Sequence, residues 1–133
     1  MATYKPLQSV SLTTTASSIT FSGIDQGYTD LVVVSSIKVT SGTPVIRLLV
    51  NSDTNSNYSR TGMYGDGSTA TGYKETSAAN LQLLSIVDNF TPMTLHFANY
   101  SNITTNKAIL MKGGITYPGI QAGLWRSTSA INA

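Results

Sequence analysis

The chain carries its longest apolar strand pattern at Leu31-Val-Val-Val34-Ser-Ser-Ile37-Lys-Val39. Val and Ile are restricted at χ1 and pack well on a pleated surface, so the segment predicts a β-strand. Alternate residues share one face, and four apolar side chains fall on it: Leu31, Val33, Ile37 and Val39. Val32 and Val34 add apolar side chains to the other face. Because a strand that is apolar on both faces is typical of the middle of a sheet, we expect this one to be central.

Shorter alternating segments lie on both sides of this strand, and Gly, Pro and Asn residues separate them. Residues 81–87 also fit a short helix, but their β-rich surroundings favour a strand. Gly113-Gly114 is expected to bend its strand. The segments are residues 7–12, 19–21, 45–51, 81–87, 93–97, 109–117 and 123–126, and Ser41-Gly42-Thr43-Pro44 predicts a turn. About eight to ten short strands without a long helix predict one all-β domain over residues 1–133, an antiparallel, jelly-roll-like β-sandwich.

Residues 51–77 differ from the rest of the chain because Asn, Asp, Ser and Gly dominate them. These residue types favour turns, so we expect a long polar loop region here, in which only residues 58–64 also fit a strand. Long loops in compact domains are often functional. We therefore expect a partner or a glycan to contact these residues: Asn55, Asn57, Tyr58, Arg60, Tyr64, Asp66 and Tyr73.

The composition narrows the classes of function. Charged residues make up 11% of the 133 residues, against roughly 25% in typical domains. Ser, Thr and Asn replace them at about a third of the chain, which predicts a polar but uncharged surface, as on extracellular modules and virion shells. The net charge of +2 comes from scattered Lys and Arg, so nucleic acid is not an expected partner. No apolar run is long enough to span a membrane, and the N-terminus lacks the apolar core of a signal peptide. We expect synthesis in a host cytoplasm.

The sequence offers little catalytic chemistry. It contains no Cys and a single His, His96, which alternation places opposite Leu95 and Phe97 and therefore on the outer side of a strand. We expect no catalytic residue, no cofactor and no metal. One alternative stays open, because Asp53-Thr-Asn55-Ser-Asn57 has the spacing that opens a Ca²⁺ loop. Tyr58 and Tyr64 stand where that loop needs Gly and Glu, so a turn is favoured over a weak cation site.

Aromatic side chains in polar segments suggest a second class of function. Tyr58, Tyr64, Tyr73 and Tyr100 lie in or beside expected loops and are expected to be exposed. Exposed aromatic rings stack on sugars or anchor protein interfaces. A carbohydrate-binding module that uses Tyr58, Tyr64, Tyr73 or Trp125 is therefore the alternative to a purely structural protein.

Five segments, in the same order, resemble a family of tailed-phage virion proteins found in marine and cyanobacterial phages, described as structural or tail-fibre-like. They are Tyr4-Lys-Pro-Leu-Gln-Ser-Val-Ser-Leu12, Ser18-Ile-Thr-Phe-Ser-Gly-Ile24, Tyr28-Thr-Asp-Leu-Val-Val-Val34, Val50-Asn-Ser-Asp-Thr-Asn-Ser-Asn-Tyr-Ser59 and His96-Phe-Ala-Asn-Tyr-Ser101. The resemblance covers nearly the whole chain. It implies a non-enzymatic component of the virion exterior, either a tail appendage or a capsid decoration protein. Its partners would be other virion proteins, further copies of itself, with a trimer expected from the class, and a host-surface glycan.

One departure from the family concerns the C-terminus. Members often continue with another pair of strands, whereas this sequence stops at Ser129-Ala-Ile131-Asn-Ala133. A missing strand would leave a sheet edge unpaired, and unpaired edges attract other chains. We therefore expect a neighbouring subunit to cover the C-terminal edge.

Overall fold

The described part of the chain is entirely β-structure and turns. The computed structural model describes residues 4–40, 45–83, 89–115 and 117–133. These residues contain no helix and form β1 (Leu31–Ile37), β2 (Arg47–Leu48), β3 (Tyr58–Gly65), β4 (Ala70–Ala78), β5 (Leu81–Gln82), β6 (Thr91–Phe97), β7 (Lys107–Gly113) and β8 (Gly119–Trp125). The expected all-β class is confirmed.

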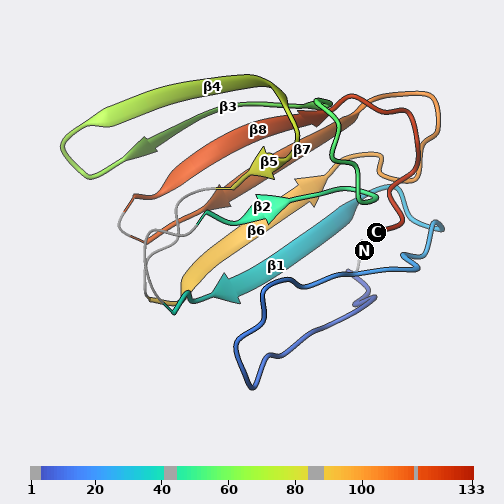
Figure 1. Cartoon of the computed structure of the whole chain (residues 1–133), viewed down its shortest axis with the longest axis horizontal. Coiled ribbons are helices and arrows are strands. Elements are labelled where there is room, and N and C mark those ends of the chain that lie inside the picture. The colour runs from blue at the N-terminus through green and yellow to red at the C-terminus, as the bar shows by residue number, and fades with distance from the viewer. Residues whose placement is uncertain (1–3, 41–44, 84–88, 116) are drawn as a thin grey trace.

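Six strands form one antiparallel sheet in the order β1-β6-β7-β8-β3-β4, and β2 pairs with β5 in a small second sheet (Figure 1). β1 pairs only with β6, in a register that sets Val33 opposite Leu95. The expectation that β1 is central was therefore wrong, because β1 is an edge strand. Of the apolar side chains on its second face, Val32 is partly buried and Val34 is largely exposed.

The six-stranded sheet buries one face only, and strict alternation in β6 and β7 produces it. Met93, Leu95 and Phe97 are buried on β6, and Ile109 and Met111 continue the same face on β7. The residues between them point to the other side, since successive side chains of a strand point to opposite faces. We call the buried side the inner face and the opposite side the outer face. Both strands were expected from their alternation and are confirmed.

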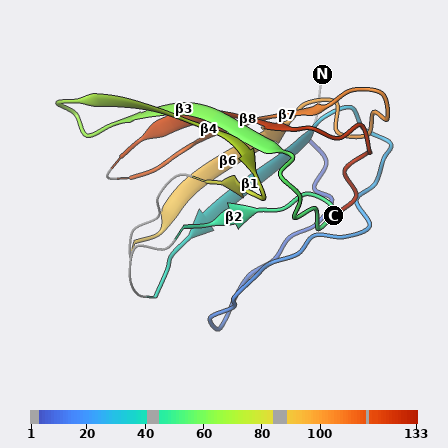
Figure 2. The same cartoon turned by 45° about the horizontal axis from the view of Figure 1, so that its top comes forward.

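The two-stranded sheet lies across the inner face (Figure 2). Its closest approach is at Gly123 of β8, where an added Cβ would lie 2.7 Å from a methyl carbon of Leu81. Gly123 therefore gives Leu81 room to bury against the large sheet. Val50, which follows β2, is also buried and donates its N–H to the Tyr58 hydroxyl over 2.9 Å. The core is thus a thin layer between a wide sheet and a narrow one.

The C-terminal segment is held by its own chain. Ile131 is buried in the core, and its N–H donates to the carbonyl of Tyr100. Asn51 donates its backbone N–H to the carbonyl of Ala133, and its side-chain oxygen accepts the N–H of Asn132. These hydrogen bonds join the C-terminal segment to the turn after β2 and to the residues that follow β6. That a neighbouring subunit covers a sheet edge near it stays a prediction.

Several other expectations fail locally. Residues 51–77 are not a long loop, because most of them form the β3–β4 hairpin. Alternation at residues 7–12 and 19–21 predicted strands that the structure does not contain. The strand expected at 45–51 is only the two-residue β2, and the strand at 109–117 ends at Gly113. The turn expected at residues 41–44 and the continuation of the 81–87 strand over residues 84–88 lie outside the described residues.

The contrast between the two faces gives a direct test of the core. Ile109→Ala should lower the free energy of unfolding by about 2–5 kcal/mol, because it opens a cavity in a fully buried position. Ile103→Ala makes the same chemical change in the exposed β6–β7 connection and should change it by less than about 0.5 kcal/mol. Urea denaturation of both variants measures the difference. Equal losses in the two variants would contradict the one-sided core.

Candidate functional site

The expected contact residues Asn55 and Asn57 lie around Asp53, whose carboxylate is a hydrogen-bonding centre. One carboxylate oxygen accepts the backbone and side-chain N–H groups of Asn55, each over 2.9 Å. The other accepts Asn57 Nδ2 at 2.8 Å and the indole Nε1 of Trp125 at 2.7 Å. These donors, the Asn57 and Trp125 side chains foremost, lower the pKa of Asp53 to about 2. Asp53 thus ties the turn before β3 to the end of β8.

This geometry favours the turn over the weak cation site. Every hydrogen bond to the Asp53 carboxylate comes from an N–H group, and a cation would have to displace these donors. The part of the chain that the structure describes holds no group of three or more His, Cys, Asp or Glu side chains arranged for a metal ion.

Two tyrosines that we expected to be exposed are fully buried. The Tyr58 hydroxyl accepts the N–H of Val50 and donates to the carbonyl of Asp53 over 3.1 Å. Burial raises the pKa of Tyr58. Tyr100 is buried as well, and its hydroxyl donates to the carbonyl of Asp25. Both rings pack into the core, so neither is available at the surface.

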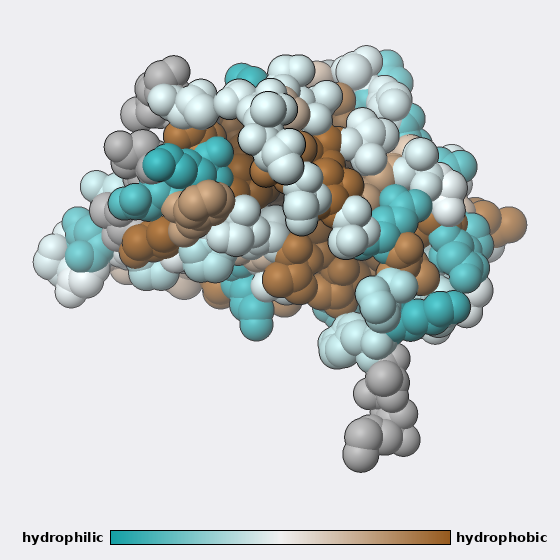
Figure 3. Space-filling model, turned by 90° about the horizontal axis from the view of Figure 1, so that it is seen from below, coloured by the Kyte–Doolittle hydropathy of each residue, from teal (hydrophilic) through white to brown (hydrophobic). Residues whose placement is uncertain are grey.

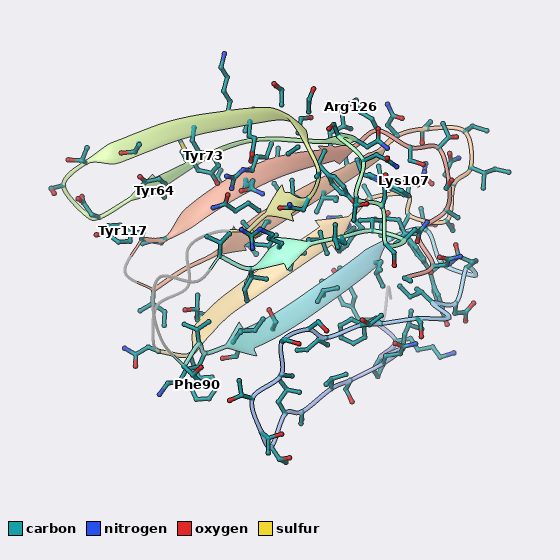
Figure 4. All side chains as sticks on the ribbon, in the orientation of Figure 1. Tyr64, Tyr73, Phe90, Lys107, Tyr117 and Arg126 are labelled. Atoms are coloured by element: carbon teal, nitrogen blue, oxygen red, sulfur yellow. The ribbon has the colours of Figure 1, made fainter. Side chains whose placement is uncertain are left out.

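Tyr64 and Tyr73, in contrast, lie together. Their ring centroids are 6.1 Å apart, and Tyr117 approaches Tyr64 edge-on at 5.9 Å. Figure 4 shows the three rings at one end of β3 and β4, beyond the two-stranded sheet. Tyr73 lies across Gly62, its partner on β3, where an added Cβ would be 2.5 Å from the tyrosine oxygen. We call Tyr64, Tyr73 and Tyr117 the tyrosine cluster.

Arg60 stands beside the tyrosine cluster but its donors are engaged. The guanidinium carbon lies 5.1 Å from the centre of the Tyr73 ring. Nε donates to Glu75 at 2.8 Å, and the two terminal nitrogens donate to the backbone and side-chain oxygens of Gln82 at 2.8 and 3.0 Å. Gln121 completes the group by accepting the Tyr73 hydroxyl at 2.8 Å. Arg60 therefore joins β3 and β4 to β5, and most of its N–H donors are engaged within the chain.

Asp66 lies at the turn of the β3–β4 hairpin. Its carboxylate accepts the backbone N–H groups of Ser68 and Thr69 over 2.9 and 2.7 Å. These two hydrogen bonds, that from Ser68 foremost, lower the pKa of Asp66. The side chain closes an exposed turn and is far along the chain from the Asp53 group. The seven expected contact residues thus divide among four separate places and do not form one site.

The outer face of the six-stranded sheet is an apolar feature that the described residues leave partly uncovered. Four large apolar side chains from different strands are well exposed there: Val34 (77%), Leu110 (53%), Ile120 (53%) and Met63 (52%). Met63 is paired with Ile120 in the register of β3 and β8, and both line an open depression of ≈ 640 Å³ together with Lys112 and Thr94. On the described part of this face His96 Nε2 lies 3.2 Å from the Asp30 carboxylate, and because both side chains are about half exposed the contact contributes little to stability.

Lys107 is the one buried lysine among the described residues, and its surroundings indicate a structural role. Its ammonium group donates to the backbone carbonyls of Thr105 and Thr128 at 2.6 and 3.4 Å. Burial lowers the pKa of Lys107. The side chain, labelled in Figure 4, connects β7 to the C-terminal segment.

Comparison with protein-family models, with curated proteins and with solved structures gives no match for this chain. The described residues also include no helix that is long and apolar enough to cross a membrane.

Sequence reasoning missed Tyr117 as a member of the tyrosine cluster and missed the outer face as a surface. A signal for the outer face was available, because Val32, Val34 and Leu110 interrupt the polar side of their strands. Tyr117 carried no such signal, since it meets Tyr64 only after β7, β8 and β3 align.

The Asp53 group predicts an acid-dependent loss of stability. The pKa of Asp53 is about 2 in the folded chain and 3.8 ordinarily, so its contribution is present above about pH 4 and is lost as the pH falls towards 2. Asp53→Asn should lower the free energy of unfolding at pH 7 by about 1–3 kcal/mol, because its amide cannot accept all four N–H donors.

Urea denaturation between pH 2 and pH 7 checks this. The loss of stability between about pH 4 and pH 2 should be smaller in Asp53→Asn than in the native chain. Trp125→Phe keeps the carboxylate and removes one donor, so part of the pH dependence should remain. An unchanged pH dependence in Asp53→Asn would show that the carboxylate is not the centre of this group.

Proposed function

We propose that this protein is a non-enzymatic structural component of the exterior of a tailed-phage particle, and that it acts by assembling with copies of itself and with other virion proteins. A tail appendage and a capsid decoration protein both fit this role. The observation that carries the assembly is the exposed apolar outer face of the six-stranded sheet. The placement on a phage particle rests on the five segments that resemble virion proteins.

The total surface supports assembly independently of any single residue. The chain exposes 8431 Å² of accessible surface for a mass of 14.1 kDa. Folded monomers of that mass expose about 6,700 Å², so the excess is about 1,700 Å². A stable interface of standard size removes about 800 Å² from each partner, so half of the excess is sufficient for one such interface.

The arrangement of the sheets supports the same conclusion. We propose that the wide and narrow sheets are an incomplete β-sandwich of jelly-roll-like type, and that neighbouring copies extend its layers. Homo-oligomers favour closed symmetry, and we keep a trimer as the expected state. The low charge of the chain, +2 in total, limits repulsion between copies.

The tyrosine cluster supports a second candidate, binding of a host-surface glycan. Tyr117 is 45% exposed and Tyr64 partly so, which leaves two ring surfaces for stacking on a sugar. Tyr73 packs against Tyr64, and its hydroxyl donates a hydrogen bond to the side-chain oxygen of Gln121. Tyr58 and Arg60 drop out of this candidate, because the first is buried and the second has its donors engaged.

Assembly is tested by measuring molar mass over a range of concentrations by sedimentation equilibrium. The native chain should be a closed oligomer, and Ile120→Asp should shift it towards monomer by at least about tenfold in dissociation constant, because a carboxylate would be buried at the interface. Ile103→Asp, which places the same charge on an exposed isoleucine outside the sheet, should leave the mass unchanged. A monomeric native chain at all concentrations, or its absence from imaged particles, would contradict the proposed function.

The glycan candidate is tested on an array of bacterial surface glycans. Any signal from the native chain should fall at least about tenfold in the Tyr64→Ala/Tyr117→Ala double variant, since each ring supplies stacking area. Tyr4→Ala, at an exposed tyrosine far from the cluster in sequence, is the matched control and should bind as the native chain does. No signal from the native chain, or equal binding by all three proteins, would remove this candidate.

A further inference from the structure

Residues 4–22 form an extended arm that makes little contact with the rest of the chain. None of these residues belongs to a strand or is buried. Figure 1 shows the arm as a long excursion below β1. At its base, Gln8 donates to the carbonyl of Ser22, and the Lys5 ammonium lies 5.7 Å from the Tyr28 ring. The arm is therefore positioned at its base, and the residues of its outer part are exposed or only partly buried.

The sequence of the arm is that of a strand with one buried face. Val10 and Leu12 alternate with Ser9 and Ser11, which is the pattern of a half-buried strand. In the structure Val10 is 49% and Leu12 53% exposed, and Ile19 on the returning segment is 43% exposed. The alternation that correctly predicted β6 and β7 thus predicts burial that the single chain does not provide.

We propose that this arm packs on the outer face of the six-stranded sheet of a second copy of the chain. The inference rests on the proposed assembly and names its two contacting surfaces. The outer face offers Leu110, Ile120 and Met63 as apolar contacts, and the arm offers Val10 and Leu12. The apolar side chains of both surfaces are about half exposed in the single chain, and each surface supplies the apolar area that the other needs.

Area and charge both fit a second copy as the occupant. The excess surface of about 1,700 Å² is larger than the about 800 Å² that a standard interface removes from each partner, and exchange of arms between copies would cover the arm and the outer face at once. The arm carries one charged residue, Lys5, at its anchored base, so its outer part brings no charge into the contact. Figure 3, seen from the side of β1 and the arm, shows areas of apolar surface between hydrophilic ones.

Crosslinking tests the contact directly, because the chain has no native Cys. A Leu12→Cys chain and a size-tagged Ile120→Cys chain are co-expressed, purified as the native assembly and treated with a short bismaleimide. A crosslinked species containing one chain of each size is the expected result. Co-expression of Leu12→Cys with tagged Ile103→Cys is the matched control and should give no such species.

The outcomes separate this inference from the proposed function. If the native chain is oligomeric but no mixed species forms, the arm does not contact the outer face and the inference fails while assembly stands. If a Leu12→Cys/Ile120→Cys double variant crosslinks only within one chain, the arm lies on its own sheet and the inference fails likewise. A monomeric native chain overturns both.

Association constants give a second measurement. Val10→Asp/Leu12→Asp should weaken self-association at least about tenfold, because two carboxylates would be moved out of water without partners. Ser9→Asp/Ser11→Asp adds the same charge to the polar side of the same segment and should have a much smaller effect. Both pairs of sites are exposed in the single chain, so the unfolding midpoint of the dissociated protein should stay unchanged. Equal weakening by the two double variants would show that only charge, and not apolar contact, is involved.

Discussion

Burial of one face of the six-stranded sheet is the constraint on which the rest of this structure depends. An antiparallel sheet with one apolar face needs a layer over that face, and the described residues supply the narrow β2–β5 sheet, the turns around Asn51 and the C-terminal segment, all on the inner face. The close approach of Leu81 to Gly123 shows how tightly that thin layer packs. After this layer has covered the inner face, the outer face and the arm still expose apolar side chains.

Polar contacts hold the narrow inner layer to the wide sheet. Asp53 joins the turn before β3 to Trp125, Arg60 joins β3 and β4 to Gln82, and Lys107 joins β7 to Thr128. Hydrogen bonds to charged groups are stronger than neutral ones, and each of these connects segments far apart in sequence. Residues that resembled a metal loop or a ligand-binding surface therefore hold the narrow layer to the wide sheet. Assembly through the outer face and stacking on the tyrosine cluster are the interactions that we propose for the exposed part of the described residues.

The proposed function and the proposed exchange of arms rest on the same observation, which is the excess of exposed surface. A chain that exposes more surface than a compact monomer of its mass reaches a stable state by covering that surface with other chains. An arm that reaches outward from its anchored base is suited to this, because it can bury its apolar side chains without rearranging the core. The glycan candidate uses a different part of the molecule and is compatible with either placement on a particle.

The sequence by itself determined the all-β class and the central strands β6 and β7, because period-two alternation depends only on neighbouring residues and on burial of one face. It did not determine that β1 is an edge strand, since pairing order depends on segments far along the chain. Nor could it show that Tyr58 is buried while Tyr64 and Tyr73 meet Tyr117, because all of them occur in similar polar surroundings. Those outcomes arise only when β8 aligns between β7 and β3. Tertiary structure decided which alternating segments obtain a partner within the chain and which, like the arm and the outer face, do not.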